Sequence, residues 1–108
     1  MNFLFKKISI SSDHAGFKLK ETIKKSLAKN KIFVIDLGPK TDSSVDYPDF
    51  AKKVARNVAS KKSKIGILIC GSGTGMAMSA NKIKKVRAAV CYNAASARLS
   101  RIHNNANI

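Results

Sequence analysis

The chain has 108 residues, of which 21 are Lys or Arg and only six are Asp or Glu, so its formal net charge is +15. This length supports one domain with a modest core, and no apolar run is long enough to span a membrane. The two cysteines, Cys70 and Cys91, are too few for a disulfide framework and match no metal motif, so we expect a reduced, cytoplasmic protein without a metal site.

The positive charge indicates either attraction to an anionic partner or a surface that is simply rich in lysine. The lysine pairs are scattered along the sequence, at 24–25, 52–53, 61–62 and 84–85. Aromatic residues make up only 6% of the chain and Trp is absent, so the composition offers no evident platform for stacking bases. We therefore expect no nucleic-acid partner and no membrane partner. The N-terminal charges follow the apolar residues 3–5, which is the wrong layout for a secretory signal.

The hydrophobic pattern predicts four units that each consist of a strand followed by a helix. We expect strands at 5–11, 32–37, 65–70 and 86–91, and helices at 16–29, 49–60, 76–81 and 93–101. In the first helix, Lys18, Lys20 and Lys24 are expected on the outer face. Residues 106–108 resemble the start of a fifth strand. The predicted fold is therefore a three-layer α/β/α sandwich, with a Rossmann-like parallel sheet of four to five strands.

Polar residues follow the first two predicted strands. Asp13 and His14 come after the first, and Asp46 and Tyr47 come after the second and a polar loop. In open parallel sheets this carboxyl edge is where ligands bind. Structural roles are the alternatives: Asp13 can cap the first helix, Asp46 or Asp49 can complement the N-terminus of the second, and His14 can be a solvated loop residue.

The stretch 65–76 contains the clearest candidate for a catalytic or anion-binding site. A short apolar strand ends in Cys70, a loop of alternating glycines follows, and a helix begins near Met76. Glycines let the backbone approach a ligand closely, and successive N–H groups can hold an anion. Beside such donors Cys70 is a candidate base or nucleophile. The alternative is a tight turn that contains an inert, buried cysteine.

Six motifs follow one another along nearly the whole chain: SDHAG at 12–16, DYP at 46–48, CGSGTGM at 70–76, ANK at 80–82, VRA at 86–88 and SRIHNNAN at 100–107. Together they resemble the ribose-5-phosphate isomerase type B family, which also includes the subunits of galactose-6-phosphate isomerase. The resemblance implies an aldose–ketose isomerase of the pentose phosphate pathway. Such an enzyme interconverts D-ribose 5-phosphate and D-ribulose 5-phosphate through an enediolate, without a metal or an organic cofactor.

The resemblance also implies roles for individual residues. Cys70 corresponds to the base, His103 to the residue that opens the sugar ring, and Asp13 to a group that binds the sugar hydroxyls and shuttles a proton. The remaining substrate-binding residues are His14 near the phosphate, Asp46, Tyr47 and Asn104, and the loop residues Gly71, Ser72, Gly73, Thr74 and Gly75, whose N–H groups would hold the negative oxygens. The family site lies between two subunits, so a homodimer is implied, in which His103 serves the Cys70 of the other copy.

The resemblance further implies that family members continue beyond the position of Ile108. They complete the fifth strand and add a C-terminal helix, and these segments carry arginines that clamp the phosphate. We expect the single domain 1–108 to lack them, while Arg98 and Arg101 are present. Two alternatives stay open, a galactose-6-phosphate isomerase subunit and an inactive member that only binds phosphorylated ligands. Because Cys70 and His103 occur in one chain, the pentose enzyme is favoured over the six-carbon one, which divides such residues between two subunits.

Overall fold

The computed structural model describes residues 5–108. The prediction about the order of apolar and charged residues at the N-terminus therefore lies partly outside the described residues. The elements in chain order are β1 (Lys7–Ser12), α1 (Phe17–Lys29), β2 (Phe33–Asp36), α2 (Tyr47–Ala59), β3 (Ile65–Ile69), α3 (Thr74–Ala80) and α4 (Ala94–Asn104). Within the described part of the chain, none of these helices has both the length and the apolar character needed to cross a bilayer.

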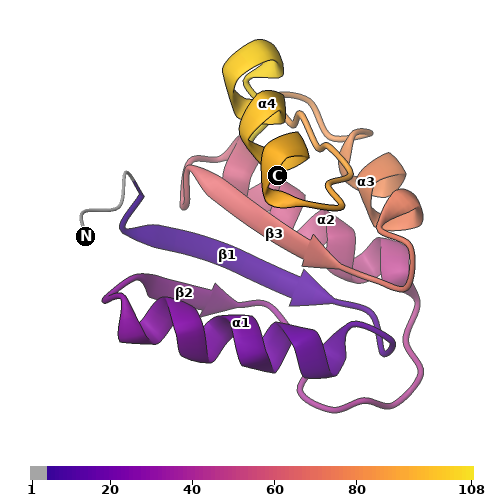
Figure 1. Cartoon of the computed structure of the whole chain (residues 1–108). Coiled ribbons are helices and arrows are strands. Elements are labelled where there is room, and N and C mark those ends of the chain that lie inside the picture. Colours follow the sequence, from indigo (N-terminus) through magenta and orange to yellow (C-terminus); the bar gives the residue numbers. More distant parts are fainter. Residues whose placement is uncertain (1–4) are drawn as a thin grey trace.

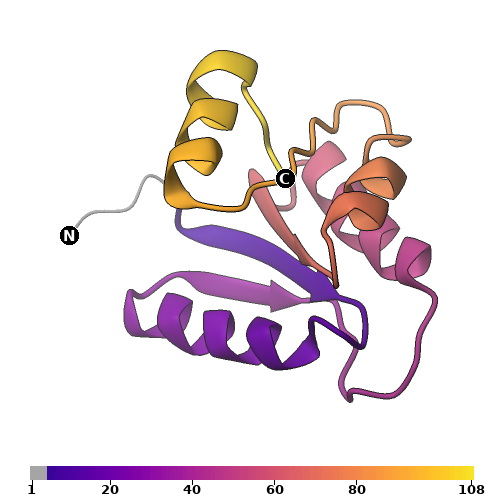
Figure 2. The same cartoon turned by 45° about the vertical axis from the view of Figure 1, so that its right-hand side comes forward.

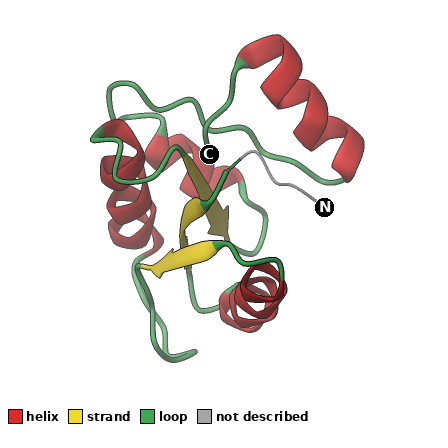
Figure 3. Cartoon of the chain, turned by 90° about the vertical axis from the view of Figure 1, so that its left-hand side faces the viewer, coloured by secondary structure: helices red, strands yellow, loops and turns green. Residues whose placement is uncertain are grey.

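The three strands form a parallel sheet in the order β2-β1-β3 (Figure 1). The central strand β1 pairs on both sides, so that Ile8 lies opposite Val34 of β2 and Ile65 of β3. Figure 3 shows α1 and α4 on one side of the sheet and α2 and α3 on the other. The α/β fold with helices on both faces of a parallel sheet is therefore confirmed.

The predicted number of strands, four to five, is wrong, because the described residues form three. Asn107 accepts a hydrogen bond from Gly66 N of β3 at 2.9 Å and donates to the Arg87 carbonyl at 2.9 Å. Ala89 N then donates to the Ile108 carbonyl at 3.1 Å, so residues 107–108 lie between β3 and segment 86–91, as Figure 2 shows for the C-terminus beside β3. Two residues are too few to form a ladder, and consequently neither 86–91 nor 106–108 is a strand.

The core on one face of the sheet comes from α2. Its residues Ala51, Val54, Ala55 and Val58 are buried at helical spacing. The helix packs against β1, β3 and α3, and Ala55 forms a cluster with Ala80 of α3 and Val86. Each fully buried valine contributes about 1.5–3 kcal/mol. α2 can lie close to β3 because Gly66 of β3 has no side chain, and a Cβ there would overlap Val54 of α2. Packing therefore fixes α2, and with it the residues at its N-terminus, relative to β3.

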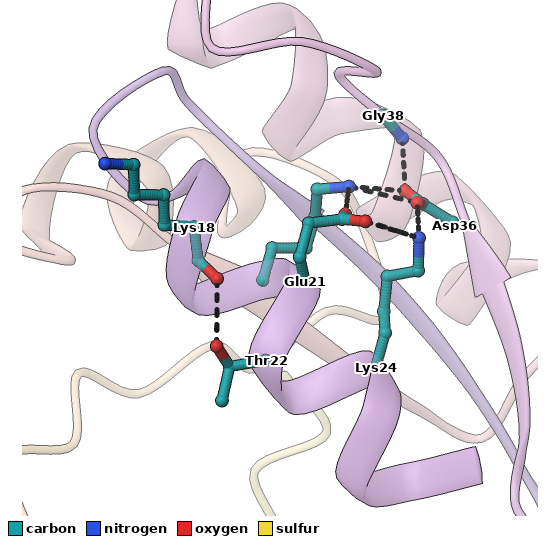
Figure 4. Close-up of polar contacts among 7 residues, drawn as sticks. Lys18, Glu21, Thr22, Lys24, Asp36 and Gly38 are labelled. Atoms are coloured by element: carbon teal, nitrogen blue, oxygen red, sulfur yellow. Dashed lines mark hydrogen bonds and ion pairs between the residues drawn. The ribbon is translucent and has the colours of Figure 1, made fainter.

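An ionic network holds the opposite side of the sheet. Lys20 was expected on the outer face of α1 but is completely buried, and its Nζ donates to both Asp36 carboxylate oxygens at 3.0 Å and to Glu21 at 2.9 Å. Lys24 donates to Asp36 at 2.6 Å, and Gly38 N donates to the same carboxylate at 2.9 Å (Figure 4). The network therefore ties α1 to the end of β2 and to the turn that leads into loop 40–46.

Candidate active site

The glycine loop after β3 folds back over Cys70. Gly73 has a φ of +80°, a conformation that residues with a side chain rarely adopt, and α3 begins at the next residue. In this arrangement Gly73 N donates to Cys70 Sγ at 3.0 Å, and Thr74 N donates to Ser72 Oγ at 3.3 Å. Cys70 is half-buried, and its sulfur accepts a hydrogen bond from a backbone N–H group at the carboxyl edge of the sheet.

Asp13 is held beside the same strand end. Its backbone N donates to the Ile69 carbonyl at 3.0 Å, and its Oδ1 accepts from Gly16 N at 2.8 Å. This turn requires glycine at position 16, because a Cβ there would lie 2.5 Å from the Ile69 oxygen. The structure therefore places Asp13 next to the residue that precedes Cys70. Asp13 closes the turn before α1 through its bond from Gly16 N, but the N-cap of α1 is Gly16 and no side chain caps the helix, so the predicted role of Asp13 as the N-cap is wrong.

Three further predicted residues gather at this edge. Val45 N donates to His14 Nδ1 at 3.4 Å, which brings the loop before α2 to the loop before α1. Asp46 occupies the N-cap position of α2 without a side-chain cap bond. The Tyr47 ring packs against Gly75, where a Cβ would lie 2.8 Å from Tyr47 Cε1. The starts of α1, α2 and α3 thus converge on the glycine loop.

A cavity of about 450 Å³ opens beside Cys70. One wall is formed by residues 70–73 and the other by 88–92, and Tyr92 is 79% exposed. This volume lies in the range of small-molecule sites. Cys91 and Tyr92 were not among the predicted site residues. Both could have been found from the sequence, because Cys91 ends and Tyr92 follows a segment that was predicted to run parallel to β3 and therefore to end at the same edge of the sheet.

His103 and Asn104 lie apart from this cavity. Both are exposed in the last turn of α4, which is capped by Asn93 at its start and by Asn105 with a φ of 51° at its end. Asn104 lines a separate hollow of about 360 Å³ with Arg87, whose Nε donates to the Asn104 carbonyl at 2.7 Å. A single copy of the described residues therefore does not bring His103 to the cavity that Cys70 lines.

The two arginines of α4 are also placed away from Cys70. Arg98 is exposed, and Arg101 donates to the Ala106 carbonyl while its guanidinium lies 5.1 Å from the centre of the Phe5 ring. Neither lines the Cys70 cavity. Among residues 5–108, no three His, Cys, Asp or Glu side chains are grouped so that they could hold a metal ion.

Comparisons with known proteins give the family of the chain and its structural relatives. The sequence model of the Ribose/Galactose Isomerase family matches residues 8–108. Ribose-5-phosphate isomerase B of Escherichia coli is 45% identical over 103 residues, covering 95% of this chain and 69% of the relative. The structure of the Clostridium thermocellum ribose-5-phosphate isomerase B has a TM-score of 0.93 at 52% identity, covering 94% of this chain and 69% of its own.

The structure of the Mycoplasma genitalium ribose-5-phosphate isomerase B contains bound ribulose-5-phosphate. It has a TM-score of 0.88 at 48% identity and covers 94% of this chain and 68% of its own. The chain thus spans 68–69% of the length of these three relatives.

Proposed function

The chain belongs to the ribose/galactose isomerase family, and on this basis we propose that it interconverts D-ribose 5-phosphate and D-ribulose 5-phosphate. The Mycoplasma genitalium relative with bound ribulose-5-phosphate supports this substrate class. The alternative within the family is a six-carbon sugar phosphate, which must fit the same pocket with one more carbon. A member that only binds phosphorylated ligands is the third possibility.

The proposed base is Cys70. The reaction moves a proton between two adjacent carbons through an enediolate, which requires a base at the carbon and donors facing the developing oxyanion. The observation that carries this role is the 3.0 Å hydrogen bond from Gly73 N to Cys70 Sγ in the wall of the cavity. The backbone N–H groups from Gly71 to Gly75 are the proposed donors to the negative oxygens.

Asp13 is the proposed partner of Cys70 in proton transfer. Its backbone is bonded to Ile69 and only one of its carboxylate oxygens is used in the turn with Gly16. Its other oxygen is proposed to bind the sugar hydroxyls and shuttle a proton between them. His14 would lie near the phosphate, and Tyr47 would contact the substrate from the start of α2.

We assign ring opening to His103 of a second copy of the chain, with Asn104 binding substrate and Asp46 orienting the histidine. Two observations support a shared site in a homodimer. His103 lies apart from the Cys70 cavity in one copy. In addition, α4 has no buried residue, and its Leu99 and Ile102 are 49% and 65% exposed.

The test is a coupled assay with ribose 5-phosphate and, separately, galactose 6-phosphate. We expect turnover of the pentose, a loss of about 10²–10⁴-fold in kcat for Cys70→Ala, and near-normal activity for Cys91→Ala, which alters the same cavity. An equal loss in both variants would assign the effect to cavity packing and refute Cys70 as the base. Tight binding of ribose 5-phosphate without turnover would favour the non-catalytic alternative.

A further inference from the structure

Charge is distributed unevenly along the strand direction. All six acidic residues lie between positions 13 and 49, and in the structure they end β2, follow β1 or β2, or belong to α1 and the start of α2. Six of the 17 lysines lie at or just before the start of a strand, at 6–7 for β1, 31 for β2 and 61, 62 and 64 for β3. Because the strands are parallel, these lysines share the amino edge of the sheet, opposite Cys70. We call these six lysines the basic edge.

Five lysines of the basic edge enclose a hollow of about 300 Å³, which is completed by Phe5 and Ser63. The buried hydroxyls of Ser9 and Ser63 lie 2.6 Å apart and tie turn 61–64 to β1. Within residues 5–108, every ion pair involves only Lys20, Lys24, Glu21 and Asp36. The fold therefore holds cations around a concave surface without an acidic partner, which favours binding of an anion.

An exposed aromatic ring lies beside this hollow. Phe33 opens β2, is 65% exposed, pairs in register with Lys7, and donates its backbone N–H to the Lys6 carbonyl at 2.8 Å. By the alternation along β1, Lys7 and Phe33 share the face on which Ser11 bonds to α2 at Phe50. Since α2 packs on β1 and β3, the Phe33 ring on the outer strand stays uncovered.

Unpaired cations in a groove next to an open aromatic ring are the two elements with which proteins bind single-stranded nucleic acid. We propose that the basic edge binds a single-stranded polynucleotide, with phosphates in the hollow of lysines and a base stacked on Phe33. The low aromatic content argued against a nucleic-acid partner, but one exposed ring next to the hollow is enough to stack a base. A lipid headgroup offers the same phosphate chemistry, yet a flat membrane meets a concave hollow poorly.

The first test is fluorescence anisotropy with a labelled oligothymidylate of about 12 nucleotides, titrated at several salt concentrations. We expect the triple variant Lys61→Gln, Lys62→Gln, Lys64→Gln to weaken binding at least tenfold and to reduce the salt slope by about 2, at about 0.7 for each phosphate contact. The matched control is Lys18→Gln, Lys25→Gln, Lys40→Gln, which removes the same charge from exposed positions elsewhere. It should change affinity by less than about twofold. Equal effects of the two triple variants would mean unspecific attraction to the net charge and would overturn the proposal.

The second test separates stacking from charge. Phe33→Ala should weaken binding by about fivefold or more without changing the salt slope, while Phe33→Tyr should retain affinity. Because the Phe33 ring is 65% exposed, we expect both variants to remain folded, and circular dichroism is the control. Unchanged binding by folded Phe33→Ala would refute the stacked base. Phosphatidylserine vesicles are the second probe, and preferential binding to vesicles that depends on the same three lysines would assign the edge to a membrane and overturn the proposal.

Discussion

Neutralising Asp36 should destabilise the protein much more than neutralising Glu21, although both carboxylates bind Lys20. The side chain of Lys20 is 0% exposed, that of Asp36 is 26% exposed and that of Glu21 is 39% exposed. Breaking a buried ion pair costs about 3–5 kcal/mol because it leaves a charge without compensation. Since Asp36 is partly solvated and Glu21 remains, we expect Asp36→Asn to lower the free energy of unfolding by about 2–3 kcal/mol. Glu21→Gln should cost at most about 1 kcal/mol.

The same network predicts an asymmetry between the two partners. In Lys20→Met the buried cation is replaced by an apolar side chain, and Asp36 keeps its bonds from Lys24 and Gly38. Lys20→Met should therefore cost less than Asp36→Asn, in which a buried ammonium loses its principal acceptor.

The assay is urea unfolding followed by circular dichroism, compared at equal m-values so that the free energies refer to one two-state transition. At about 4–8 °C per kcal/mol for a domain of this size, Asp36→Asn should lower the Tm by roughly 10–20 °C. The reasoning fails if Asp36→Asn and Glu21→Gln lose equal stability, or if Lys20→Met is the most destabilised of the three variants.

Three other predictions concern pH and the glycines. Burial acts to raise the pKa of Asp36, but hydrogen bonds from Lys24, Gly38 and Lys20 outweigh it and hold the pKa below the ordinary 3.8. The stability that the charged Asp36 contributes should therefore be complete above about pH 4 and be lost as the pH falls through the lower pKa of the folded state. The hydrogen bond to Asp36 raises the pKa of Lys24 despite burial. The stability that the charged Lys24 contributes should therefore be present below the ordinary pKa of 10.5 and be lost as the pH rises through the higher pKa of the folded state. Urea unfolding at several pH values tests this, and both losses of stability, at low and at high pH, should be absent from Asp36→Asn. In Gly16→Ala the new Cβ must push the turn away from Ile69, so the free energy of unfolding should fall by about 1–3 kcal/mol and isomerase activity should fall with it. A parent-like free energy of unfolding in urea would rule out this close contact. In Gly71→Ala the new Cβ meets no atom within 4 Å, so the Tm should stay within a few degrees of the parent value. The backbone N–H is retained, so a fall in kcat/KM would report close approach of the substrate to position 71, and an unchanged kcat/KM would argue against that close approach.

The sequence predicted those parts of the fold that depend on local pattern. The apolar run before Cys70 and the amphipathic pattern before Lys29 gave β3 and α1 nearly to the residue. The burial of Lys20 was not predictable by such a pattern, because its acceptor Asp36 lies 16 residues away on another element. Segment 86–91 has the composition of a strand, but a strand also needs a neighbouring strand to pair with. Residues 107–108 supply only a few hydrogen bonds to it, so the segment is not a strand.

The candidate site was predictable to the extent that topology determines it. The parallel sheet brings the segments after β1 and β3 to one edge, which is why Asp13 lies beside the strand that leads to Cys70. The contact between Tyr47 and Gly75 joins α2 to α3 across the edge, and it depends on a glycine that was assigned for ligand approach rather than for packing. His103 was grouped with Cys70 through a family resemblance, and a single copy of the described residues keeps it away from the Cys70 cavity.

The candidate active site and the basic edge should act independently of each other. They lie at opposite ends of β1, whose six residues span about 20 Å. This is about twice the distance over which charges are screened at physiological ionic strength. The triple variant at Lys61, Lys62 and Lys64 should therefore keep its kcat/KM for the sugar phosphate within about twofold near 0.15 M salt. Reciprocally, Cys70→Ala should bind the oligonucleotide like the parent chain, since the cysteine lines only the opposite edge. A loss of isomerase activity in the lysine variant that is not restored at any salt concentration would mean that the two edges are coupled through the strands.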